Sequence, residues 1–262
     1  MKLGRIQPRP QRKLELHAYR TMALPTPPPT CDWSVGNGAE IVCAQMYDND
    51  RLGDCVIAGG YHLIGVASSV QAPGAKGFIA SESQILADYG AIGGYNPADP
   101  STDNGCDEIT AMNYWADHGF ADGSKVQAWG TVPADNQTLV KQSIWLFETL
   151  LLGIGLPDAW LPDSPTAAPN SDHVWDVAGD AIPTNGHCVV GVGYTKDGII
   201  VITWGGKRLL TWAALAKYAV SGAGGECYSL LLTDEFGQLK QAPNGFDYSA
   251  INAAFASIRS NP

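Results

Sequence analysis

Apolar residues recur at helical spacing through the first half of the chain. Within residues 55–69 a single stripe carries the positions Val56, Gly60, Leu63, Ile64 and Ala67. Spacings of three and four residues predict an amphipathic helix there, and Gly53 supplies a flexible turn before it. Cys55 then falls in the first turn of this helix. Similar patterns predict further helices over residues 81–89, 107–118 and 136–146.

Beyond residue 146 the pattern changes to period two and to short apolar runs. Strands are predicted over residues 149–156, 186–194, 198–204 and 227–232, with a hairpin turn at residues 196–198. A helical lobe over about residues 50–135 therefore precedes a β-rich lobe over about residues 136–235. The predicted fold class is α+β.

The two ends of the chain differ from the body, which we place at residues 31–235. Residues 1–30 form a basic, proline-rich arm, with four prolines between Leu24 and Thr30 and a charge of +5 over residues 1–20. Prolines fix an extended backbone, so we expect the arm to be ordered only where it packs against another surface. The tail over residues 236–262 holds a predicted amphipathic helix at residues 248–260, which a neighbouring subunit or protein partner would contact.

Composition places the chain among globular proteins and removes several function classes. Its 262 residues are 45% hydrophobic and 16% charged, enough apolar sequence for a large core. A net charge of −10 argues against nucleic-acid binding by the body. We find no membrane-spanning stretch and no secretory signal, so a cytoplasmic location is expected. Six cysteines without a C-x-x-C pair argue against a zinc ribbon and predict mostly free thiols. We expect no metal site and no cofactor.

Cys55 and His187 are the candidate catalytic pair. A cysteine reacts as its thiolate, which the positive end of a helix dipole and a nearby imidazolium favour. His187 begins the strand predicted over residues 186–194, and a thiol at a helix start with a base at a strand start is typical of thiol hydrolases. Asn49 supplies an amide that could stabilise an oxyanion together with the Cys55 backbone N–H. For a lone cysteine or histidine, a structural role is the ordinary alternative.

An ordered set of motifs resembles the papain-like cysteine peptidases. The matching segments are Asp32-Trp33, Asn49 to Cys55, Ser81 to Asp88, Asn104-Gly105-Cys106 with His118-Gly119-Phe120, Gly186 to Tyr194, and Trp204-Gly205. The resemblance implies a two-lobed papain-like fold with a barrel-like antiparallel sheet in the second lobe. It also implies that Trp204 shields the catalytic pair and that Trp204, Gly53 and Asp54 contact substrate.

Several positions depart from the family pattern. Asn49 replaces a longer Gln, and Val56 replaces a Trp. Asp54 places a negative charge beside the thiol, which should raise its pKa. The residue that orients the histidine, Asn or Asp in the family, aligns with Ile202, or with Thr203 if the turn is one residue shorter. Threonine would be a weak third member, and isoleucine none.

Other histidines, cysteines and acids compete with these assignments. His173 follows Asp172 as the histidine does in the family, but no Val-Gly-Tyr strand comes after it. His62 is expected to be a packing or surface residue, and Cys188 to point to the opposite strand face from His187. An acidic cluster at the start of the third predicted helix is expected to be solvated: Asp103, Asp107 and Glu108.

The sequence therefore predicts a thiol hydrolase acting on peptide or amide bonds. Cys55 would be the nucleophile, His187 the general base, Asn49 the oxyanion donor and Thr203 the third member, with a peptide or protein as substrate. The alternative is a catalytically weak or inactive papain-fold protein with a binding or structural role, such as a component of a phage or virion. The incomplete triad favours this alternative, as does the arm, which is far too short to be the family's inhibitory propeptide.

Overall fold

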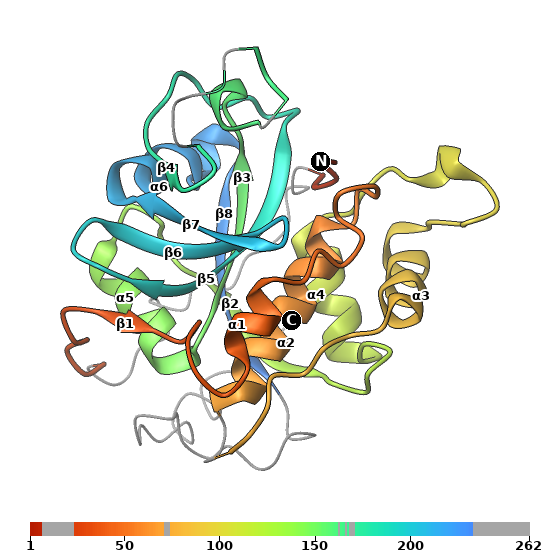
Figure 1. Cartoon of the computed structure of the whole chain (residues 1–262), viewed down its shortest axis with the longest axis horizontal. Helices are drawn as coiled ribbons and strands as arrows, with labels where there is room; N and C mark the ends of the chain where they lie inside the picture. The colour runs from red at the N-terminus through yellow and green to blue at the C-terminus, as the bar shows by residue number, and fades with distance from the viewer. Residues whose placement is uncertain (7–23, 71–73, 162, 166, 168–170, 233–262) are drawn as a thin grey trace, which may run out of the picture.

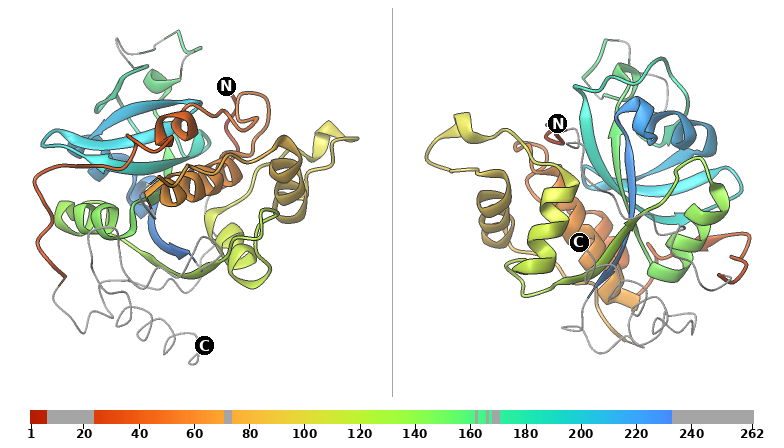
Figure 2. Two further views of the ribbon diagram at one scale, coloured as in Figure 1. Left: turned by 60° about the horizontal axis from the view of Figure 1, so that its bottom comes forward. Right: turned by 180° about the vertical axis from the view of Figure 1, so that it is seen from behind.

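The computed structural model describes residues 1–6, 24–70, 74–161, 163–165, 167 and 171–232 of the chain. Within this part, most helices gather in one lobe, and the strands lie in another with the remaining helices packed on them (Figure 1), and the N-terminus lies where the lobes meet (Figure 2). None of the helices in these ranges is long and apolar enough to cross a membrane.

The helical lobe is built around one buried helix. Its members are α1 (Ala39–Cys43), α2 (Cys55–Val70), α3 (Glu82–Gly93) and α4 (Glu108–Asp117). Every position of α2 except its last is buried. A capping box between Ser81 and Gln84 fixes the start of α3, and the Asp107 carboxylate caps α4 by accepting from a backbone N–H of its first turn.

The second lobe is one mixed sheet that stays open. Its strands are β1 (Cys31–Asp32), β2 (Val126–Thr131), β3 (Leu150–Gly155), β4 (Val174–Trp175), β5 (Gly186–Tyr194), β6 (Gly198–Thr203), β7 (Gly206–Thr211) and β8 (Glu226–Leu232). They follow the order β2-β8-β3-β5-β6-β7-β4, with β1 added beside β5. All neighbours pair antiparallel except β4 and β7, which pair parallel. The sheet is therefore open and almost entirely antiparallel, and it does not close into a barrel.

Two hydrophobic cores lie on opposite faces of this sheet. The first packs α2 and α4 against β5, through side chains such as Ile57 and Val190. The second is formed with α5 (Gln137–Phe147) and α6 (Trp212–Tyr218), and at its centre the rings of Trp160 and Trp175 stack at 4.8 Å. Because β5 lies between both cores, all nine of its residues are buried. This packing holds the start of α2 against the start of β5.

Most predicted elements are confirmed, with ends that differ by a few residues. The helices predicted in the first half correspond to α2, α3, α4 and α5, and the predicted strands to β3, β5, β6 and β8. β2, β7 and α6 were not predicted. β2 lies within the range expected for the helical lobe, yet it joins the sheet by pairing with β8. The helix predicted over residues 248–260 lies outside the described residues.

Candidate active site

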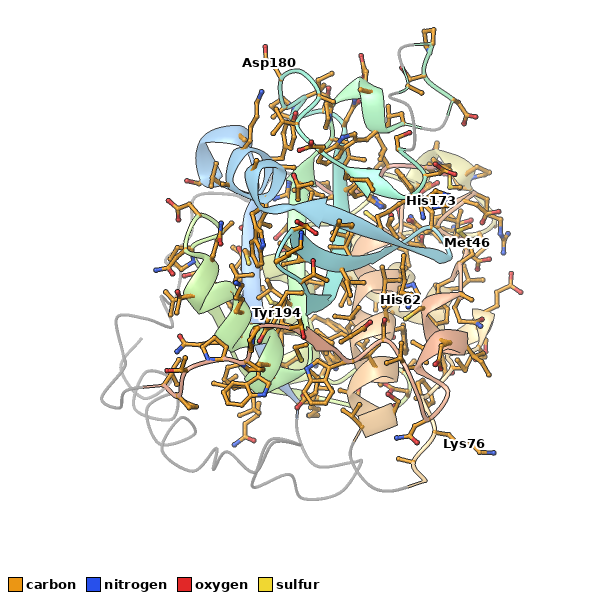
Figure 3. The ribbon with its side chains drawn as sticks, turned by 60° about the vertical axis from the view of Figure 1, so that its left-hand side comes forward. Met46, His62, Lys76, His173, Asp180 and Tyr194 are labelled. Carbon is orange, nitrogen blue, oxygen red and sulfur yellow. The ribbon has the colours of Figure 1, made fainter. Side chains whose placement is uncertain are left out.

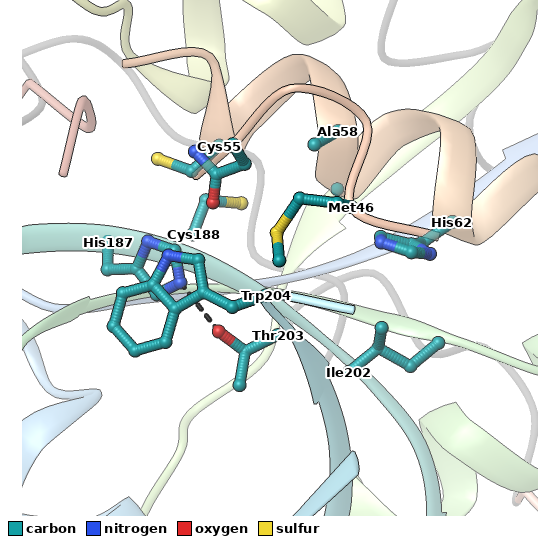
Figure 4. A pocket seen from close by; sticks show the side chains of 11 residues that line it. Met46, Cys55, Ala58, His62, His187, Cys188, Ile202, Thr203 and Trp204 are labelled. Atoms are coloured by element: carbon teal, nitrogen blue, oxygen red, sulfur yellow. Dashed lines mark hydrogen bonds between the residues drawn. The ribbon is translucent and has the colours of Figure 1, made fainter. Parts of the chain in front are cut away.

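The candidate nucleophile and base line one cavity at the junction of the two lobes. Cys55 is the first residue of α2, and His187 is the second residue of β5. Both side chains line one small cavity, together with Asn49, Thr203 and Trp204 (Figure 4). The cavity measures about 10 Å³, which is room for one water molecule. The structure therefore places five of the predicted site residues around one cavity that is too small for larger molecules, whereas Gly53 and Asp54, predicted to contact substrate, do not line it.

One ring nitrogen of His187 is hydrogen-bonded, and the other is buried without a partner among the described residues. Its Nε2 lies 2.8 Å from Oγ1 of Thr203, and the indole of Trp204 stacks on the ring at 4.3 Å between centroids. Its Nδ1 has no hydrogen-bond partner among the described residues. When Nε2–H donates to Thr203, Nδ1 carries a free lone pair, which a general base requires.

The turn between β6 and β7 explains the position of the indole. Trp204 and Gly205 form the two-residue connection, with φ of 42° and 64°. Positive φ at both central residues is the geometry of a type I′ hairpin turn, which suits glycine and strains tryptophan. The strained residue lies directly against His187, so the turn places Thr203 and Trp204 on the ring together.

Burial keeps both members of the pair neutral in this structure. Burial raises the pKa of Cys55 to about 12, and the nearby carboxylates of Glu108 and Asp54 act in the same direction. Hydrogen bonds from the backbones of Cys188 and Gly4 favour the thiolate but do not overcome the burial. Burial also lowers the pKa of His187 to about 3. A neutral thiol beside a neutral imidazole is a resting arrangement.

Asn49 lies in the cavity wall, but its amide is engaged. Nδ2 donates to the carbonyl oxygen of Leu52 and to Oδ1 of Asp54, each at 3.2 Å. Both of its protons are therefore used. Its role as an oxyanion donor stays a prediction that requires one of these bonds to be exchanged.

Asp54 is buried beside Asn49, and burial raises the pKa of its carboxyl to about 8. The folded state therefore favours the neutral carboxyl. Its contribution to the free energy of unfolding is fully present below the unfolded pKa near 4, and it is lost as the pH rises through the folded pKa of about 8.

We expect wild type to lose up to about 3–4 kcal/mol of unfolding free energy between pH 5 and pH 8 that Asp54→Asn keeps, so the variant gains stability relative to wild type as the pH rises. Urea denaturation at both pH values measures this difference, with Asp48→Asn as the control. A constant difference between wild type and Asp54→Asn across this range would contradict the assignment.

The first residues of the chain cover the site. The backbone N–H of Arg5 donates to the Gly186 carbonyl at 3.3 Å, and the Gly4 carbonyl accepts from Cys106 N–H at 3.0 Å. These bonds join the segment to both lobes. Gly4 lies so close to Gly53 that an added Cβ would overlap its carbonyl. This packing was not predicted, because the sequence showed residues 1–30 only as an extended basic arm.

The competing residues lie in different surroundings. His173 is exposed, with 77% of its side chain accessible, and pairs with Asp172 at 3.4 Å. His62 is buried on α2 (Figure 3) and lines the same cavity, where burial lowers its pKa to about 4. Cys188 is also buried and lines the cavity. The expectation of solvated acids is wrong for Glu108, whose side chain is fully buried against Arg5, and for Asp103, whose side chain is 3% exposed and pairs with Lys2.

No set of three or more His, Cys, Asp and Glu side chains in the described part of the chain is arranged to hold a metal ion. The six cysteines are free, Cys106 among them.

Comparison with solved structures gives the fold. Xylellain, a cysteine protease from Xylella fastidiosa, superposes with a TM-score of 0.60 at 15% identity, over 87% of this chain and 95% of that chain. Digestive procathepsin L 3 from the larval midgut of Tenebrio molitor gives 0.56 at 13% identity, over 87% and 75%. The bromelain protease from Ananas comosus gives 0.51 at 11% identity, over 78% and 98%. No family model and no curated protein matches the sequence. The chain has a divergent papain-like fold.

Proposed function

We propose that the protein is a thiol hydrolase that cleaves peptide or amide bonds with Cys55 and His187. One observation carries this proposal: Thr203 engages Nε2 of His187 and Trp204 stacks on its ring, while Nδ1 has no hydrogen-bond partner among the described residues, in a cavity that His187 lines together with Cys55. An unpartnered buried nitrogen costs free energy, and His187 differs from His62, whose Nδ1 is also unpartnered, in having its other nitrogen bonded to Thr203 and its ring stacked on an indole.

In the proposed reaction, Nδ1 of His187 takes the thiol proton as the Cys55 sulfur attacks the carbonyl carbon of the scissile bond. The oxyanion would be stabilised by the backbone N–H of Cys55 and by Asn49 once its amide turns from Asp54. The imidazolium then gives its proton to the leaving amine, and an acyl-enzyme remains on the sulfur. Water, deprotonated by His187, releases the acid and restores the thiol.

Two features favour slow hydrolysis. A threonine hydroxyl orients His187 less firmly than an amide or a carboxylate would, and residues 1–6 cover the site. The same features support a second candidate function, that of a papain-fold binding protein without catalysis.

Cleavage of a mixed peptide pool, followed by mass spectrometry, separates the two candidates. We expect Arg5→Ala to cleave peptides faster than wild type, since Arg5 anchors the covering segment. Cys55→Ala in the same background should abolish cleavage, and Cys188→Ser should retain it. Cleavage that persists in Cys55→Ala, or that is absent from every variant, would contradict the hydrolase proposal.

A further inference from the structure

The side chain of Arg5 enters a buried acidic pocket beside the candidate active site. Its Nε donates to Glu108 at 2.7 Å, one terminal nitrogen donates to Glu226 at 2.8 Å, and the other to the Gly224 carbonyl at 2.7 Å. The two carboxylates come from different lobes, at the starts of α4 and β8. All three side chains are at least 95% buried. Three converging acceptors match the planar fork of a guanidinium.

The backbone around the pocket leaves space for this group. Gly153 on β3 pairs with both Cys188 and Glu226, and a Cβ at this position would overlap the guanidinium and the Glu108 carboxylate. The absence of a side chain at Gly153 therefore creates the volume that Arg5 fills. A cavity closed by hydrophobic packing would have a side chain at this central strand position.

The Arg5 guanidinium bridges two buried carboxylates, and Oε2 of Glu108 has no hydrogen-bond partner among the described residues. The hydroxyl of Tyr228 donates to Glu226, which holds that carboxylate in place. A buried ion pair that served only to hold the segment could be replaced by apolar side chains at little or no loss of stability. Two buried acids around one arginine are better explained by recognition of that side chain.

We propose that Glu108 and Glu226 form a specificity pocket for the arginine side chain of a peptide ligand, and that Arg5 of the chain's own first residues fills it here. The pocket adjoins the catalytic pair, because the Arg5 backbone bonds to Gly186, the residue before His187. The inference deepens the proposed function, on which it rests for the nature of the ligand. A peptide that carries arginine would displace residues 1–6 and take over their bonds to both lobes.

Binding measured without catalysis tests the pocket. The measurement uses the full chain with Cys55→Ala and one further change that vacates the pocket. Arg5→Ala removes the side chain that fills the pocket, and Gly4→Val expels residues 1–6 because the valine side chain would overlap Gly53. Calorimetry would use acetylated, amidated tetrapeptides that differ at a single residue: arginine, citrulline, lysine or leucine. Citrulline keeps the shape of arginine and removes its charge.

We expect the arginine peptide to bind at least about tenfold more tightly than the citrulline peptide in both backgrounds, with lysine between them. Adding Glu226→Gln should bring the ratio of arginine to citrulline affinity close to one, while a Gly222→Val control, at an open position, should leave it unchanged.

Equal affinity for arginine and citrulline in either folded background would overturn the proposal, and so would failure of both variants to fold, because residues 1–6 would then be part of the core. Selective arginine binding by a chain that cleaves no peptide would support the pocket and contradict the hydrolase function.

Discussion

Expelling residues 1–6 from the junction should raise the alkylation rate of Cys55 by iodoacetamide about 10²–10³-fold near neutral pH. Burial raises the pKa of Cys55 to about 12, whereas an exposed cysteine ionises near about 8.5. Each pKa unit changes the thiolate fraction about tenfold, and the thiolate is the reactive form. The other side chains of the cavity wall still bury part of the Cys55 thiol when residues 1–6 leave. The pKa therefore falls by less than the full difference, and the expected acceleration begins at about 10²-fold.

Gly4→Val provides this test, because its side chain would overlap the backbone of Gly53. Gly222→Val serves as the matched control, since a Cβ there meets nothing within 4 Å. Peptide mass spectrometry over time gives the rate for each cysteine separately. An unchanged Cys55 rate in Gly4→Val, with a normal melting temperature, would show that residues 1–6 do not bury the thiol.

The second large effect concerns Thr203, whose hydroxyl is the only hydrogen-bond partner that the described residues offer to the His187 ring. Thr203→Val keeps the shape and removes the bond, so we expect kcat/KM for peptide cleavage to fall about 10- to 100-fold. Thr203→Asn should instead raise kcat/KM about tenfold, because an amide oxygen accepts from Nε2–H and fixes the tautomer.

The two variants together separate orientation from stability. Both variants change the same buried position. If Thr203 had only a structural role, both would lower the melting temperature, and kcat/KM of the folded protein would be the same in Thr203→Val, Thr203→Asn and wild type. Equal turnover in wild type and Thr203→Asn, with loss of turnover in Cys55→Ala, would show that another group orients His187.

Local sequence signals account for most of the fold that could be predicted. The capping residues Ser81 and Asp107 mark the starts of α3 and α4, and the apolar run of β5 reflects burial on both faces. β7 and α6 were missed because each is short, with exposed or half-buried residues among its buried ones. β2 was missed because two of its three buried positions are an alanine and a glycine, and the positions between them are exposed or half-buried, which weakens the period-two pattern.

The sequence predicted five of the residues that line the cavity, but not how they pack. Neighbouring strand residues face opposite sides, so the choice between Ile202 and Thr203 depended on a one-residue register that only the turn at Trp204 settles. The structure places Thr203 on His187 and Ile202 in the first core.

The contacts of Arg5 lie beyond any local pattern. Arg5 lies 103 residues from Glu108 and 221 residues from Glu226. A pairing over such separations leaves no periodic signal in the sequence, and a charged residue near a helix start is usually solvated. Only the fold, by joining the starts of α4 and β8, shows that these acids share a pocket.

The measurement that tests the catalytic pair most directly is covalent labelling by a peptide that carries a thiol-reactive electrophile, followed by mass spectrometry. It would compare Gly4→Val alone with Gly4→Val combined with His187→Ala, at neutral pH. We expect one adduct, on Cys55, and at least about a hundredfold slower labelling when His187 is absent. Labelling of Cys55 at the same rate without His187, or labelling that favours another cysteine, would contradict the account.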